Sequence, residues 1–285
     1  MNIGSGRYRP TQVAASILFG VSLCLALGCQ ATPSAESRSP VLSFVVVNHA
    51  VTAPLLTADP NDPAWAGAPL IHGFSLSLGS PPKDQVLPTD VRLLWDKDRL
   101  YVRFTCLGPK PESPFGNTHD GKHYQGDAVE VFIDPVGDGR QYFEFQHSAA
   151  GGLLDQNTTL TADAESDAKG RLVQRVLQRD YWPNLSYDMA DVKVADSVTP
   201  AGDQFLWIAD IALPAAGVLK RMGKTTYEPM NLRLNLMRYH WTGPIEQADR
   251  KLIATNWSPV TWGCPHQSPA AMGTIELVNK PQASR

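Results

Sequence analysis

The stretch GDAVEVFIDPVGDGRQYFEFQHS, residues 126–148, alternates apolar and polar side chains on both sides of a Gly-Asp-Gly turn. A period of two is typical of a β-strand that buries one face. The stretch therefore predicts a hairpin with strands at 128–134 and 141–147. The side chains expected to face the core are Val129, Val131, Ile133, Phe143 and Phe145.

The opposite face of this hairpin carries two acids, Glu130 and Glu144, beside Phe132 and Tyr142. If the turn pairs odd positions with odd ones, both acids lie on the same outer face, and the pattern leaves open whether they are directly opposite. Like charges directly opposite are destabilising unless an arginine, a cation, a shared proton or a ligand compensates them. The alternative interpretation is a solvated outer face without a specific role.

The same period recurs from residue 41 onward, with turn residues between the apolar runs. We predict an all-β fold, a single antiparallel β-sandwich of jelly-roll type with long loops and at most one or two short helices. A helix is expected at 164–179, a tight turn at 96–98, and long loops at 107–126 and 242–269. Further strands are expected at 42–47, 70–78, 91–95, 100–106, 151–155, 191–197, 204–212, 231–240, 251–255 and 273–278.

The composition is that of a folded protein, because 43% of the 285 residues are hydrophobic and 19% are charged. The net charge of -3 leaves no basic surplus to neutralise a phosphate backbone, which argues against nucleic-acid binding. A neutral or weakly polar partner fits this balance better.

The N-terminal segment 1–28 has the pattern of a bacterial lipoprotein signal peptide, with two arginines before an uncharged apolar run at 13–27. Cys29 is then the expected lipidated residue, 29–41 a polar tether, and 42–280 the folded domain. We expect a protein of the cell envelope, anchored through lipid to the outer membrane or cell surface. Ordinary secretion and a retained membrane helix remain alternatives.

Two cysteines, Cys106 and Cys264, fall inside the expected domain. In an oxidising envelope compartment they are candidates for a disulfide, and two buried free thiols are the equal alternative. The cysteine spacing fits neither a structural zinc site nor an attached c-type haem.

Seven segments, in order, resemble carbohydrate-binding module family 9 and its broader relatives over about residues 50–278. They are TADPNDPAWAGA, VRLLWDKDRLYVRFTC, DAVEVFIDP, QYFEFQHSAAGGLLD, FLWIADIALP, LRLNLMRYHW and WSPVTWGCPHQSPAAMGTIEL. The resemblance implies a β-sandwich in which two aromatic rings enclose a terminal sugar and polar side chains hold its hydroxyls. It also implies that a structural calcium ion is present in some members.

Carried onto this chain, the resemblance places one ring at Tyr124, the acidic contact at Glu130 and an asparagine at Asn235. The second ring position is His266, with Trp262 close by. The family's sugar-binding arginine falls at or near Glu144, so one charge is reversed and the family's sugar specificity does not transfer. From the strand pattern we add Arg92 as a further hydroxyl contact and Arg238 as a residue that orients the acids.

The sequence thus predicts non-catalytic binding of a glycan or oligosaccharide, associated with polysaccharide breakdown, with no required cofactor. One alternative is a glycoside hydrolase that uses Glu130 and Glu144 as acid and nucleophile. Others are a calcium site at Asp134 and Asp138, a metal site at His119 and His123, and a b-type haem held by Met237 or His240. Trp257, like Trp262, is open between a sugar platform and a core position.

Overall fold

The computed structural model describes residues 42–77, 86–163, 165–166, 172–174, 176–260 and 265–281. In these residues a mixed sheet of 14 strands is folded over on itself into a sandwich. Its strand order is β11-β8-β7-β6-β14-β16-β1-β4-β5-β13-β12, and β2, β3 and β15 pair off this path. The predicted β-sandwich is confirmed.

The strands of this sheet are β1 (Phe44–His49), β2 (Leu70–Ile71), β3 (Ser75–Leu76), β4 (Thr89–Trp95), β5 (Arg99–Gly108), β6 (Ala128–Asp134), β7 (Gln141–Ser148), β8 (Leu153–Leu160), β11 (Tyr181–Asn184), β12 (Lys193–Ala201), β13 (Gln204–Pro214), β14 (Met230–Trp241), β15 (Leu252–Asn256) and β16 (Gly273–Pro281). A separate pair consists of β9 (Glu165–Ser166) and β10 (Leu172–Val173). The helices are α2 (Ala215–Val218) and the 3-10 turns η1 (Pro63–Trp65), η3 (His123–Gln125), η4 (Gln178–Asp180), η5 (Lys220–Met222), η6 (Pro265–Gln267) and η7 (Pro269–Ala271). Among the described residues, no helix is long and apolar enough to span a membrane.

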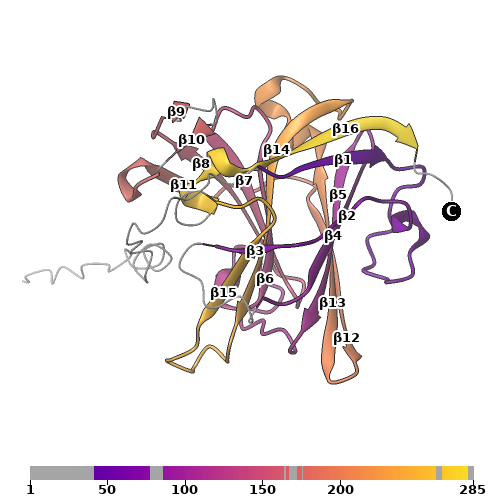
Figure 1. Ribbon diagram of the computed structural model, residues 1–285, viewed down its shortest axis with the longest axis vertical. Helices are drawn as coiled ribbons and strands as arrows, with labels where there is room; N and C mark the ends of the chain where they lie inside the picture. Colours follow the sequence, from indigo (N-terminus) through magenta and orange to yellow (C-terminus); the bar gives the residue numbers. More distant parts are fainter. Residues whose placement is uncertain are drawn as a thin grey trace, which may run out of the picture.

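The two halves of the folded sheet face each other across the main core. In Figure 1, β6 and β15 lie on the left, β12 and β13 on the right, and β1 and β16 join the halves above them. The odd residues of the opening hairpin fill this core as predicted, and Trp257 also packs in it. The core residue Trp257 is therefore not a sugar platform.

The sheet is mixed, which corrects the expectation of a purely antiparallel arrangement. Strand β1 runs parallel to both of its neighbours, β16 and β4. The reason is topological: β1 begins the folded part and β16 ends it, so the first and last strands meet at the joint between the halves. Period-two patterning predicts strands but not their relative direction.

The outer faces of the sandwich are covered as well, which the interpretation as solvated faces did not anticipate. Over β6, β7 and β14 lies a cluster that we call the outer cluster, made of Ala128, Phe132, Tyr142, Leu160, Val176, Met237, Tyr239, Ala254 and Met272. Over β4, β5 and β13 lies a smaller one, made of Ala50, Trp65, Ala68, Leu94, Tyr101 and Ala212. Polar residues on these faces therefore need partners inside the protein.

The helix expected at 164–179 is wrong. The described residues of this segment form β9, β10 and η4, and β11 follows directly. Gln174 is buried, and its Nε2 donates to the carbonyls of Gly139 at 2.8 Å and Ala162 at 2.7 Å. Tertiary contacts thus override the local helix propensity.

Candidate functional site

The two acids of the opening hairpin lie on the same face but are not directly opposite. Glu130 pairs with Gln146, and Glu144 pairs with Phe132, so the acids are diagonal neighbours. With His266 from η6 they bring three ligand atoms within 4.8 Å of one another. Neither glutamate has any exposed surface. We call Glu130, Glu144 and His266 the acid–histidine cluster.

Glu144 is held by neutral donors from the neighbouring strands. Its Oε1 accepts from Gln146 Nε2 at 2.6 Å, and its Oε2 accepts from Gln156 Nε2 at 2.5 Å. His266 Nδ1 lies 3.3 Å from Oε2. Sequence reasoning missed Gln146 and Gln156 as partners, although both are at even positions like Glu144. Two amides thus take the place of the positive charge that the family resemblance implied.

Glu130 is in a different situation, because neither of its carboxylate oxygens has a hydrogen bond of good geometry among the described residues. Burial, and then the charge of Glu144, raise the pKa of Glu130 well above its ordinary value, and the nearby Tyr239 side chain opposes this rise only in part. The raised pKa favours the uncharged acid. Of the compensations that the sequence left open, a proton is the one that this environment favours.

Aromatic rings surround the histidine of the cluster. Phe132 meets the His266 ring edge-on, with ring centres 4.9 Å apart. The hydroxyls of Tyr142 and Tyr181 lie 3.2 and 3.5 Å from His266 Nδ1. Tyr181 was missed because it follows the segment that was expected to be helical. The outcome is a closed site of rings and acids rather than an open polar face.

Two of the residues that the resemblance implied lie on this face, but neither offers its side chain freely. Tyr124 is half-buried and packs against the outer cluster. Asn235 Nδ2 donates to the carbonyl of Ser258 at 3.0 Å, and Asn235 Oδ1 accepts from the Ser258 amide at 2.9 Å. Asn235 therefore fixes the segment after β15, and its amide is occupied inside the protein.

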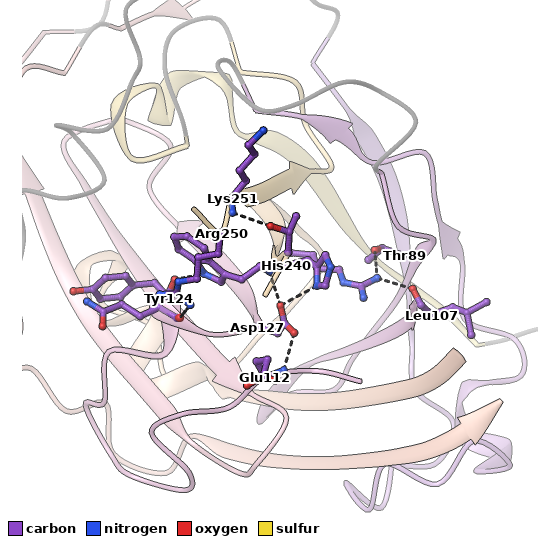
Figure 2. Close-up of polar contacts among 12 residues, drawn as sticks. Thr89, Leu107, Glu112, Tyr124, Asp127, His240, Arg250 and Lys251 are labelled. Atoms are coloured by element: carbon purple, nitrogen blue, oxygen red, sulfur yellow. Dashed lines mark hydrogen bonds and ion pairs between the residues drawn. The ribbon is translucent and has the colours of Figure 1, made fainter. Parts of the chain in front are cut away.

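The two predicted arginines lie elsewhere. Val91 and Leu93 point into the main core, so Arg92 between them faces the opposite outer surface of the sandwich from Glu130. The prediction that Arg238 orients the acids is wrong, because its Nη1 donates to Leu107 O at 3.2 Å and Thr89 Oγ1 at 3.1 Å (Figure 2). Alternation along β14 turns Arg238 away from the acid face.

Some predictions fall outside the described residues, namely those on Cys29, Trp262 and Cys264. Cys106 is described as a buried free thiol in β5, and burial raises its pKa. The disulfide, the lipid anchor and the Trp262 platform stay predictions.

The segment that carries Tyr124 is fastened to the end of β14 by the Asp127 carboxylate and by the Trp241 side chain. Asp127 Oδ1 accepts from the Trp241 amide at 2.8 Å and lies 3.1 Å from His240 Nδ1, while Oδ2 accepts from the Glu112 amide at 2.7 Å (Figure 2). The Trp241 indole N–H also donates to the Tyr124 carbonyl at 3.0 Å. Neither Asp127 nor Trp241 was predicted to have this role.

We expect Asp127→Ala to lower the free energy of unfolding by roughly 1–3 kcal/mol, because it removes a charged acceptor from two part-buried backbone donors. Hydrogen exchange should show the largest loss of protection in residues 109–127. Urea denaturation measures the stability change, with Asp203→Ala in the exposed β12–β13 turn as control. Equal stability of the two variants would contradict the anchoring role.

Contacts within the protein occupy the two acids at the turn after β6, Asp134 and Asp138. Asp134 accepts from the amides of Gly137 and Gly139, each at 2.8 Å, and both glycines have positive φ angles of 76° and 66°. Asp138 accepts from the Arg140 amide at 2.9 Å and pairs with Arg221 at 2.8 Å. These contacts favour the hairpin interpretation. Calcium at Asp134 and Asp138 stays a prediction.

Besides Asp134 and Asp138, two groups of described residues bring enough ligand atoms together to hold a metal ion. One group is the acid–histidine cluster, and the other joins His119 to Asp120, Asp155 and Asp188. His123 does not belong to this second group, since it is buried and its Nε2 lies 3.0 Å from the Thr118 carbonyl. The predicted pairing of His119 with His123 is therefore wrong.

The hydrolase and haem alternatives gain no support from the geometry. Hydrolysis needs a sugar and a water molecule at both acids, and neither Glu130 nor Glu144 has exposed surface. Met237 is buried in the outer cluster, while His240 is held by Asp127. These side chains do not form one open haem slot.

Comparisons with known proteins give a consistent family. The model of the carbohydrate family 9 binding domain-like family matches residues 59–280. No curated protein sequence matches the chain. Among solved structures, a candidate carbohydrate-binding protein from Bacteroides uniformis ATCC 8492 is similar, with 16% identity, a TM-score of 0.56, and coverage of 84% of this chain and 100% of that one.

A carbohydrate-binding module of family 9 from Caldicellulosiruptor kristjanssonii is also similar. Its glucose complex has 16% identity, a TM-score of 0.52, and coverage of 84% of this chain and 97% of that one. Its cellotriose complex has 15% identity, a TM-score of 0.50, and coverage of 84% and 95%. At this identity the structures show a shared fold. The family model spans most of the chain, and the protein therefore belongs to the carbohydrate family 9 binding domain-like family.

Proposed function

We propose that this protein binds a neutral oligosaccharide or polysaccharide and performs no chemistry on it. The observation that carries the proposal is the family match over residues 59–280. Support comes from the shared fold of the family 9 module that was solved with glucose and with cellotriose. The net charge of -3 is also compatible with an uncharged ligand.

The closed state of the acid–histidine cluster supports a binding role over a catalytic one. Both glutamates are fully buried, and the amides of Gln146 and Gln156 occupy Glu144. A catalytic acid pair must reach the scissile bond from two sides. The cluster is therefore better suited to fix the positions of β6 and β7 than to act on a ligand.

The cellular setting of this proposal rests on the N-terminal sequence. Two arginines, an apolar run and Cys29 support export and lipid attachment at the cell envelope, with 29–41 as a tether. A lipid-anchored sugar-binding domain would hold polysaccharide near the cell surface, where breakdown products can be taken up. Metabolic labelling with an alkyne fatty acid tests this part, and Cys29→Ala should abolish the label.

Binding is tested by titration calorimetry and affinity electrophoresis of the domain, residues 42–280, against glucose, cellotriose and a panel of neutral plant, algal and bacterial polysaccharides. We expect at least one of them to bind with a dissociation constant between about 1 µM and 1 mM, equivalent to roughly 4–8 kcal/mol. Absence of binding to every member of the panel would refute the proposed function.

A further inference from the structure

Strand β11 carries the most exposed aromatic ring in the part of the chain that the structure describes. Trp182 is 60% exposed. Its neighbour Tyr181 reaches His266 on the acid face, so alternation along the strand turns Trp182 to the opposite face of the sheet. An exposed tryptophan at an ordered strand position is unusual, because burial of this side chain contributes strongly to stability.

The registers of three strands place polar, uncharged side chains beside this ring. Trp182 lies opposite Thr159 on β8, and Thr159 lies opposite Gln141 on β7. In the next row on this face, Asn184 lies opposite Asn157. The even residues of β8 belong to the acid face, since Leu160 is in the outer cluster. We call Trp182, Thr159, Gln141, Asn157 and Asn184 the Trp182 face.

The amides of this face are ordered and still have free hydrogen-bonding capacity. Gln141 Nε2 donates to Asn157 Oδ1 at 2.6 Å. This bond orients both planar groups, and no described residue occupies Gln141 Oε1 or Asn157 Nδ2. Gln141 and Asn157 thus leave one acceptor and one donor group without a partner among the described residues. Asn184 Oδ1 accepts from the Ser186 amide at 3.2 Å, which leaves the Asn184 Nδ2 group. None of the five side chains carries a charge.

The free edge of β11 is poorly suited to a partner strand. Pro183, next to Trp182, has no backbone N–H, and proline in a sheet is confined to edges where the missing donor faces solvent. The exposed ring is therefore not explained by edge-to-edge pairing. The five side chains are uncharged, and the nearby Arg221, whose Nη1 donates to the Gln141 carbonyl at 3.3 Å, is paired with Asp138 at 2.8 Å. This charge balance disfavours an anionic ligand such as nucleic acid.

We propose that the Trp182 face is a carbohydrate-binding surface, on which a neutral polysaccharide chain lies across β11, β8 and β7. The indole would stack on the apolar C–H face of one sugar, while Gln141, Asn157 and Asn184 bind hydroxyls of its neighbours. Two strand spacings separate Trp182 from Gln141, about 10 Å, which favours a chain over a single sugar. This inference rests on the proposed function and assigns it a surface away from Tyr124 and Glu130.

The test is affinity electrophoresis and calorimetry of the wild type and its variants against the polysaccharide that binds the wild type best. We expect Trp182→Ala to weaken binding at least 10-fold, Trp182→Phe to retain part of it, and Asn157→Ala to weaken it 3-fold or more. Phe44→Ala, which removes another exposed ring on β1, is the control and should bind within 3-fold of wild type. Tyr124→Ala tests the ring position that the family resemblance implied. Because Trp182 is exposed, thermal unfolding should show unchanged stability for both of its variants.

Wild-type binding that survives Trp182→Ala, or is abolished only by Tyr124→Ala, would overturn this inference and leave the proposed function standing. If the wild type binds no glycan, both fall together. Sedimentation velocity covers the remaining explanation: a wild-type dimer that dissociates in Trp182→Ala would assign the face to self-association and refute the carbohydrate assignment.

Discussion

Replacing Asp210 by alanine is expected to lower the free energy of unfolding by about 3–5 kcal/mol, the cost of removing one partner from a buried ion pair. Asp210 has no exposed surface, and Arg103, directly opposite it on β5, is only 3% exposed. The carboxylate accepts from Arg103 Nε at 2.7 Å and Nη2 at 2.8 Å. Without it, the guanidinium stays buried with no counter-charge.

The pair also fastens the segment before β2 onto the sandwich. Asp210 Oδ2 accepts from the Ala58 amide at 3.0 Å, and Arg103 Nη1 donates to the Asp59 carbonyl at 2.8 Å. The guanidinium lies 4.8 Å from the centre of the Trp65 ring. Loss of Asp210 should therefore release residues 58–65 as well as weaken the β5–β13 pairing.

Urea denaturation provides the measurement, and an exposed ion pair provides the control. Arg140 and Asp163 are 2.9 Å apart, and their side chains are 64% and 75% exposed. Asp163→Ala should cost no more than about 1 kcal/mol, since water screens and replaces such pairs. If the two aspartate variants are equally stable, the buried pair does not hold the segment as described.

The strand pattern predicted most of the sandwich because a period of two is a local property of the sequence. For the opening hairpin, the predicted strand at 128–134 and its core face are confirmed. Register is not local in the same way, since it depends on how many residues the turn absorbs. The turn that Asp134 stabilises sets Glu130 opposite Gln146 and so determines which polar groups meet.

The covered outer faces could not be predicted from strand patterns. A face that bears Glu, Gln, Tyr and Asn is similar in sequence whether it meets water or a layer of loops. Here His266 follows Glu144 by 122 residues along the chain, and Tyr181 follows it by 37. No local signal in the sequence links these residues. The exposed Trp182 was missed for the same reason, because its strand forms only by pairing with β8.

The second large effect concerns Glu130 and depends on pH. Because its pKa in the folded protein is raised above the ordinary value of 4.5, the folded state binds the proton more tightly than the unfolded chain does. The contribution of Glu130 to stability is therefore fully present below about pH 4.5 and is lost as the pH rises through the raised pKa. Above it, a buried charge beside the Glu144 carboxylate, which the nearby Tyr239 side chain offsets only in part, destabilises the fold.

Glu130→Gln removes this titration while keeping the shape of the protonated acid. We expect the variant to match the wild type near pH 4.5 and to become more stable by roughly 1–3 kcal/mol at pH 8, the range for an unsatisfied buried polar group. Thermal and urea unfolding between pH 4.5 and 9 measure the difference. The same substitution at exposed Glu246 should leave the pH profile of the wild type unchanged. If the stability of Glu130→Gln changes with pH in parallel with that of the wild type, the pKa of Glu130 does not differ between the folded and unfolded states. A charged partner such as a bound cation would then have to neutralise the Glu130 carboxylate.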